Sequence, residues 1–291
     1  MQAATRLHEA GIASNRRSAY CGEYVPGPLI MDERTVNLNK FYNEDCDEEE
    51  RLLSKHGSIE FITTTKYIDD LLKNGDRILE VGAGTGRYSL YYANKGYKVN
   101  AIEFVQHNVD ILKSKITPNM DIAAEQGDAL DLSRFNDNTF DVTLVLGPLY
   151  HLYNETDINK AIEEAIRVTK KDGYVAIAYL TSDSIFVNWA LKKNHLIDGY
   201  PNDFDKNFKM INYPDGIFSA FYIKEFKDIM AKHNVTLVKN IATDGLSYHF
   251  KEKIDSLNDQ EFEVWVRYHI STCEREELQG YSNHMLYICK K

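Results

Sequence analysis

Residues 78–88, ILEVGAGTGRY, decide the fold of this chain. The apolar side chains on both sides of Glu80 are typical of a buried strand, and three glycines follow at every second position, Gly82, Gly84 and Gly86. Loops of this kind connect a strand to a helix and hold a nucleotide near the free backbone amides of the helix. The stretch therefore predicts a strand–loop–helix unit that binds a nucleotide.

Strand and helix patterns alternate along the chain around this unit. The predicted strands are residues 77–82, 97–103, 121–128, 140–147 and 174–180, and the predicted helices are residues 59–75, 88–96, 108–116 and 157–173. A helix at 224–234, a strand at 235–242, a helix at 261–277 and a strand at 284–291 follow. This order predicts an α/β fold with a doubly wound, mostly parallel sheet, whose ligands bind beyond the carboxyl ends of the strands.

The glycine loop differs from a dinucleotide-binding loop. The third glycine of the G-x-G-x-x-G motif would fall on Arg87, so the close packing of helix on strand that a glycine permits is blocked. Glu80 lies two residues before Gly82 and would repel a pyrophosphate, whereas it would attract an ammonium or a sulfonium group. S-adenosylmethionine carries both groups, so the loop favours this ligand over NAD.

Three residues at the ends of later strands agree with that ligand. Glu103 ends the second strand, where a carboxylate can accept hydrogen bonds from ribose hydroxyls, and a solvated acid is its alternative role. Asp128 follows the third strand and could accept from the adenine amino group, or it could cap a helix. Gly147 ends the fourth strand, where the backbone passes close to the ligand.

With these motifs the chain resembles the class I S-adenosylmethionine-dependent methyltransferases. ILEVGAGTGRY, AIEFV, GDALDL and FDVTLVLGPLYHL stand in the order and spacing of that family. The segments GPLYHL, IEEAIRVTKKDGYV and LQGYSNHMLYICKK look like its bacterial small-molecule subgroup, the type 11 or UbiE-like enzymes. The resemblance implies a Rossmann-like sheet of seven strands with the last strand antiparallel.

The resemblance also implies which residues contact S-adenosylmethionine and its product S-adenosylhomocysteine. Glu80 and the glycine loop would hold the methionine part, Glu103 the ribose and Asp128 the adenine, while Gly147 would line the region of methyl transfer. Tyr42, in KFYNEDC, would lie on a segment that closes over the cofactor, with ordinary packing as its alternative. The full predicted set is Tyr42, Glu80, Gly82, Ala83, Gly84, Gly86, Glu103, Phe104, Asp128, Ala129 and Gly147.

The candidate catalytic residues are His151 and Tyr150, just past the fourth strand. Methyl transfer needs a nucleophile held in line with the methyl group, and a base only if the nucleophile arrives protonated. The imidazole of His151 could be that base, or it could cap the loop or pack under a lid. Tyr150 could contribute its hydroxyl or its ring face.

The chain divides into four predicted segments. Residues 1–30 are an extension that could be disordered, and residues 31–183 are the nucleotide-binding core. Residues 184–222 are rich in aromatic side chains and predict a helical cap, which would line the acceptor pocket or form a small core of its own. Residues 223–291 complete the sheet and add further helices.

Composition narrows the class of protein. The net charge of −10 argues against a nucleic-acid partner, because binding phosphates requires basic side chains. No apolar stretch is long enough for a membrane span, and the first 30 residues lack the apolar core of a signal peptide. The cysteines are scattered, so we expect no metal site from Cys21, Cys46, Cys273 and Cys289. We therefore expect a cytoplasmic monomer or homodimer.

Taken together, the residues predict a methyltransferase that uses S-adenosylmethionine and methylates nitrogen or oxygen of a small molecule. Positioning and exclusion of water would carry most of the catalysis, with His151 as a candidate base. The alternatives are a module that binds S-adenosylmethionine without catalysis, a protein or RNA methyltransferase, and an NAD-linked oxidoreductase, against which Glu80 and Arg87 argue.

Overall fold

The computed structural model describes residues 33–45, 53–197, 200–211 and 216–291. The predicted extension at residues 1–30, together with Cys21 and Cys46, lies outside the described residues. Cys273 and Cys289 are free and buried. No helix within the described ranges has both the length and the apolar composition that a membrane crossing needs.

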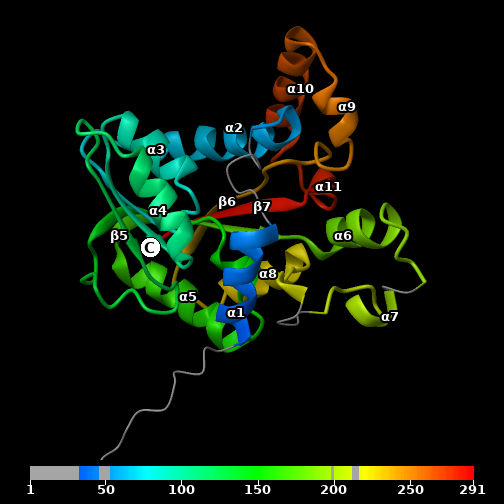
Figure 1. The fold of residues 1–291 in the computed structure, drawn as a ribbon, viewed down its shortest axis with the longest axis horizontal. Coiled ribbons are helices and arrows are strands. Elements are labelled where there is room, and N and C mark those ends of the chain that lie inside the picture. Colours follow the sequence, from blue (N-terminus) through cyan, green and yellow to red (C-terminus); the bar gives the residue numbers. More distant parts are fainter. Residues whose placement is uncertain (1–32, 46–52, 198–199, 212–215) are drawn as a thin grey trace, which may run out of the picture. The chain divides into compact units, whose positions relative to one another are not determined.

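One sheet of seven strands organises the described chain, in the order β3-β2-β1-β4-β5-β7-β6 (Figure 1). Strands β1 to β5 pair in parallel, and β7 runs antiparallel to both β5 and β6. This topology confirms the predicted doubly wound fold. The strands are β1 Arg77–Val81, β2 Lys98–Glu103, β3 Ile122–Gln126, β4 Phe140–Val145, β5 Thr169–Leu180, β6 Thr236–Ala242 and β7 His284–Lys290.

Helices cover both faces of the sheet because the strand order reverses at β1 and β4, and right-handed crossovers then fall on opposite faces. Figure 1 shows α3 and α4 on one side of the sheet and α5 and α8 on the other. The central strands are buried from both sides, as their continuous apolar runs predict. The flanking helices are α2 Lys55–Asp69, α3 Arg87–Asn94, α4 Gln106–Lys115, α5 Glu155–Val168 and α8 Ile223–Met230.

The predicted helix over residues 157–173 was wrong at its carboxyl end. The helix ends at Val168, and Thr169 already has an extended backbone, with φ −75° and ψ 138°. Four residues between Thr169 and Tyr174 lie opposite a single residue of β4, so β5 begins with a bulge. Asp172 takes a φ of 65° within it. The strand pairing across this bulge therefore overrides the helical periodicity of the sequence.

Two helical segments interrupt the second half of the sheet. The predicted cap contains α6 Ser182–Ile185, the π-helix η3 Phe186–Leu191 and α7 Tyr200–Asp203. Phe186 contacts Phe204 and Phe208 at ring-centre distances of 5.0 and 5.4 Å, so these rings form a cluster within the cap. Phe221 instead packs with the rings of the main core beside β5.

The second helical segment lies between β6 and β7 and was only partly predicted. It contains α9 Lys251–Asp255, α10 Asp259–Thr272 and α11 Glu276–Gln279. A capping box of Asn258 and Glu261 begins α10. The predicted helix over residues 261–277 is therefore two helices separated by a turn at residues 273–275.

Candidate cofactor and active site

The glycine loop follows β1 in the conformation that its sequence predicts. Gly82, Gly84 and Gly86 have φ values of 77°, 52° and 92°, a region that favours glycine. A Cβ atom at Gly82 would lie 2.5 Å from Cδ of Pro148, and one at Gly86 would lie 2.1 Å from Cδ1 of Leu112. The loop therefore packs closely against the segment after β4 and against α4, with no room for a side chain at either glycine.

Glu103 at the end of β2 holds the loop in place. Its Oε2 atom accepts a hydrogen bond of 2.8 Å from the backbone N–H of Gly84. Its Oε1 atom accepts one of 2.9 Å from the N–H of Val105. The carboxylate thus lies beside the glycine loop, where the sequence analysis expected a ribose-binding acid, and the backbone fixes its orientation.

Glu80, near the end of β1, is buried and bonded within the chain. Its side chain is 1% exposed and accepts a hydrogen bond from the hydroxyl of Ser89, on α3. Burial raises the pKa of this carboxyl to about 8, with a smaller contribution from the nearby charge of Glu103. Glu80 therefore joins β1 to α3 and is mostly protonated at neutral pH, so the expected attraction of a carboxylate for cationic groups has little force here.

The adenine end of the predicted site contains a residue that the sequence analysis missed. Arg34, on α1 Glu33–Lys40, donates two hydrogen bonds to Asp128, of 2.9 and 3.3 Å. Its guanidinium also lies 4.8 Å from the ring centre of Phe104. Arg34 thus contacts both side chains that were expected to surround adenine. A basic residue on the same N-terminal segment as Tyr42 was the only signal for it.

The remaining predicted cofactor residues, Ala83, Ala129 and Gly147, have a small side chain or none. Ala83 and Ala129 are both 6% exposed, so neither offers much surface. Gly147 has a φ of −179°, and a Cβ atom there would lie 3.7 Å from the carbonyl oxygen of Gly82. The position would accept other small residues, so the close approach predicted for Gly147 needs no glycine.

Tyr42 and His151 lie together, although 109 residues separate them in sequence. Tyr42 is in the π-helix η1 Phe41–Asp45, and His151 ends the 3-10 helix η2 Pro148–His151. His151 Nδ1 is 2.8 Å from the carbonyl oxygen of Ile217, which can only accept, so Nδ1 carries the proton. Nε2 is then the acceptor for the Tyr42 hydroxyl, at 2.8 Å. Burial lowers the pKa of His151 to about 4.

Aromatic rings extend this contact across the site. Phe218, from the end of the cap segment, lies 5.3 Å from the His151 ring and 5.5 Å from Phe41. Tyr150 is 7% exposed, and its ring lies 6.3 Å from that of His151 and 5.8 Å from that of His284. The N-terminal segment and the cap therefore meet over the carboxyl end of β4, where His151 is 6% exposed.

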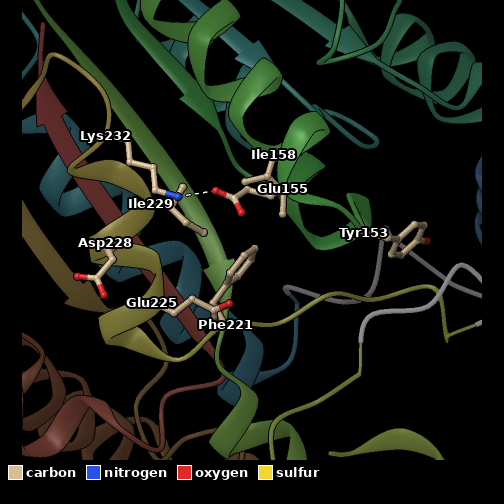
Figure 2. Close-up of a pocket in the computed structure, with 8 residues that line it drawn as sticks. All are labelled: Tyr153, Glu155, Ile158, Phe221, Glu225, Asp228, Ile229 and Lys232. Carbon is tan, nitrogen blue, oxygen red and sulfur yellow. Dashed lines mark hydrogen bonds and ion pairs between the residues drawn. The ribbon is translucent and has the colours of Figure 1, made fainter.

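A separate groove of about 300 Å³ lies between α5 and α8. Figure 2 shows its lining side chains, including the ion pair of Glu155 with Lys232. Its eight lining residues include none of the predicted site residues. We therefore place the candidate site at the glycine loop and not in this groove. In the parts of the chain that the structure describes, no group of three or more His, Cys, Asp or Glu side chains could hold a metal ion.

Comparisons with known proteins agree with this geometry. Residues 79–177 match a family described as a methyltransferase domain. A demethylmenaquinone methyltransferase of Paenarthrobacter aurescens is 37% identical over 107 residues, which are 37% of this chain and 40% of that protein. The chain thus spans less than half the length of this relative.

Solved structures extend the likeness of fold over most of the chain. A methyltransferase of Methanosarcina mazei superimposes with a TM-score of 0.52 and 19% identity, covering 77% of this chain and 96% of the other. A methyltransferase of Mesorhizobium loti superimposes with a TM-score of 0.52 and 13% identity, covering 81% of this chain and 100% of the other. On its fold, its glycine loop and the match over residues 79–177, the chain contains a class I S-adenosylmethionine-dependent methyltransferase domain.

Proposed function

We propose that this chain binds S-adenosylmethionine at the glycine loop and transfers its methyl group to nitrogen or oxygen of a small molecule. The observation that carries the proposal is the hydrogen bond of 2.8 Å from the Gly84 amide to the Glu103 carboxylate. It places a fixed carboxylate beside a loop of three left-handed glycines. A nucleoside with a charged tail could use both features.

The residues fit the cofactor better at one end than at the other. The glycine loop and Glu103 lie together, where the methionine and ribose parts would bind. At the adenine end, Asp128 and Phe104 already contact Arg34, so binding requires this guanidinium to move or to share the space. When bound, the cofactor supplies an activated methyl group, and the chain has to orient the acceptor and exclude water.

The side chains that cover the site favour a small methyl acceptor over a large one. Tyr42 and Phe218 close over His151 from two separate segments. The relatives named demethylmenaquinone methyltransferases act, by their name, on a small molecule. The match to them lies in the cofactor-binding half, so the acceptor of this chain depends on its own cap and its own β6–β7 segment.

Thermal unfolding in the presence of ligands tests the proposal. We expect S-adenosylmethionine and S-adenosylhomocysteine to raise the midpoint, because a ligand at about 1,000 times its Kd adds about 4 kcal/mol of stability. NAD should give no shift. Glu103→Gln should weaken the response, whereas Glu125→Gln, at a mostly exposed position in β3, should leave it unchanged. No shift with either sulfur ligand, or a shift with NAD alone, would refute the proposal.

A further inference from the structure

Helix α10, between β6 and β7, lies outside the predicted site and is largely exposed. Of its fourteen residues only His269 is buried, whereas α5, which is equally long, buries six residues. Figure 1 shows α10 at the top of the view, standing away from the sheet. Helices that pack on a core bury a full apolar face. Most of the surface of α10 therefore faces solvent in a single chain.

One side of α10 attaches it to the rest of the chain. The Lys55 ammonium, on α2, lies 5.8 Å from the ring centre of Phe262. The indole N–H of Trp265 donates a hydrogen bond of 2.9 Å to the Ser247 hydroxyl. The buried His269 follows four residues later. Residues three and four positions apart are neighbours on a helix, so Phe262, Trp265 and His269 define one attached side.

The opposite side of α10 exposes two large apolar side chains. Val264 is 55% exposed and Tyr268 is 49% exposed. They are four residues apart, so they form a continuous apolar strip on the helix surface. Gln260 and Ser271, which are also exposed, extend the same side toward the two helix ends. An apolar strip with a polar rim is a surface that another molecule can cover.

Charged side chains beside this apolar strip differ between the two halves of α10. Glu263 and Arg267 are exposed and four residues apart, so they share one edge of the strip. In the described ranges neither side chain has a hydrogen-bond or ion-pair partner. Asp259 and Glu261 add further acids to the first turn. The helix is therefore acidic in its first half, and its one arginine lies in its second half.

This charge pattern complements itself when two such helices run antiparallel. A parallel pair would place the acids of one helix beside the acids of the other. An antiparallel pair places each acidic half beside the half that contains Arg267, and it also brings opposite ends of the two helix dipoles together. Ion pairs at the edges of packed helices select their orientation in this way. The exposed face of α10 thus fits a second copy of itself.

We propose that a second copy of this chain packs its own α10 antiparallel against this face, so that the protein forms a two-fold symmetric dimer. With the axis near Trp265, Glu263 of each copy lies opposite Arg267 of the other, which gives two equivalent ion pairs. The same arrangement joins Val264 and Tyr268 of both copies into one apolar strip. The dimer does not depend on the proposed function, and binding of S-adenosylmethionine does not test it.

The length of α10 sets the expected strength of the dimer. A helix of fourteen residues is about 21 Å long. One pair of such helices buries less than the roughly 800 Å² per partner that is typical of stable complexes. The net charge of −10 on each chain also opposes association. We therefore expect a dimer that dissociates on dilution, with a Kd on the order of 10 µM.

Sedimentation velocity of the full chain in about 0.15 M salt measures the association. We expect the sedimenting species to change from one chain to two as the concentration rises from roughly 1 µM to roughly 100 µM. Val264→Glu should remain a single chain over the whole range, because it places a charge from each copy in the apolar strip. Its position is exposed, so circular dichroism should show the helix content of the wild type.

An exchange of charges tests the antiparallel arrangement. Arg267→Glu places like charges opposite each other at both pairs and should raise the Kd of the dimer by about tenfold or more. Adding Glu263→Arg restores both pairs with their signs reversed, so the double variant should regain most of the wild-type affinity. Lys224→Glu is the matched control, because it changes the net charge equally at an 85% exposed position on α8.

Three outcomes would count against the proposal. A wild-type chain that stays single over the whole concentration range would overturn it and leave the face to a different partner. A dimer that neither Val264→Glu nor Arg267→Glu weakens would also overturn it, because another face must then form the contact. A double variant as weak as Arg267→Glu alone would overturn the antiparallel pairing of Glu263 with Arg267.

Discussion

Replacing Gly86 by alanine tests the packing of the glycine loop. An alanine forced into a left-handed conformation costs about 1–2 kcal/mol. The new Cβ would also lie 2.1 Å from Cδ1 and 3.1 Å from Cγ of Leu112, a side chain that is 0% exposed. Overpacking of this kind costs a further ~1–3 kcal/mol. We therefore expect Gly86→Ala to lower the free energy of unfolding by about 2–5 kcal/mol in total.

Gly96→Ala is the matched control. Gly96 has a φ of 88°, close to the 92° of Gly86, but a Cβ atom there meets nothing within 4 Å. It should therefore cost only the conformational part, about 1–2 kcal/mol. Urea unfolding of both variants, followed by circular dichroism, measures the difference.

A double variant tests the contact with Leu112 separately. In Leu112→Ala the clashing atoms are gone, so adding Gly86→Ala should cost no more than Gly96→Ala does. If Gly86→Ala and Gly96→Ala lower the stability of the otherwise wild-type chain equally, Leu112 rotates away at little cost. The close-packing argument for the loop would then be wrong.

Three further substitutions test the electrostatics of the site. Arg34→Ala removes the ion pair with Asp128 and should lower the Kd for S-adenosylmethionine by about fivefold, which corresponds to roughly 1 kcal/mol. Calorimetry measures this Kd. Weaker binding would instead make Arg34 part of the cofactor site. Tyr42→Phe removes the hydrogen bond to the neutral form of His151, so the pKa of His151, about 4 in the parent, should rise in an NMR titration. Burial raises the pKa of Glu80 to about 8 from 4.5, so the folded chain keeps a proton that the unfolded chain has lost. Folding stability should therefore fall as pH rises from about 5 to about 8, and Glu80→Gln should flatten that fall in urea unfolding; an unchanged slope would contradict the buried, protonated state.

Local sequence patterns predicted which strands and helices form better than they predicted where each one ends. Strands β1 and β4 are recognisable because residues buried on both faces form continuous apolar runs. The end of α5 was missed because Thr169 pairs with Phe140 in the neighbouring strand, and periodicity along one segment contains no information about that partner. The break after α10 was missed for a similar reason, since Cys273 lies in the buried core.

The sequence by itself determined the order of strands and helices, the left-handed glycine loop and the acid at the end of β2, because spacing along the chain defines each of them. Tertiary structure alone decided which side chains meet. Arg34 reaches Asp128 across 94 residues, Tyr42 reaches His151 across 109, and His284 reaches Asp244 across 40. It also decided the charge of Glu80 and the basicity of His151, since burial is a property of the packed chain and penalises the charged form of either group.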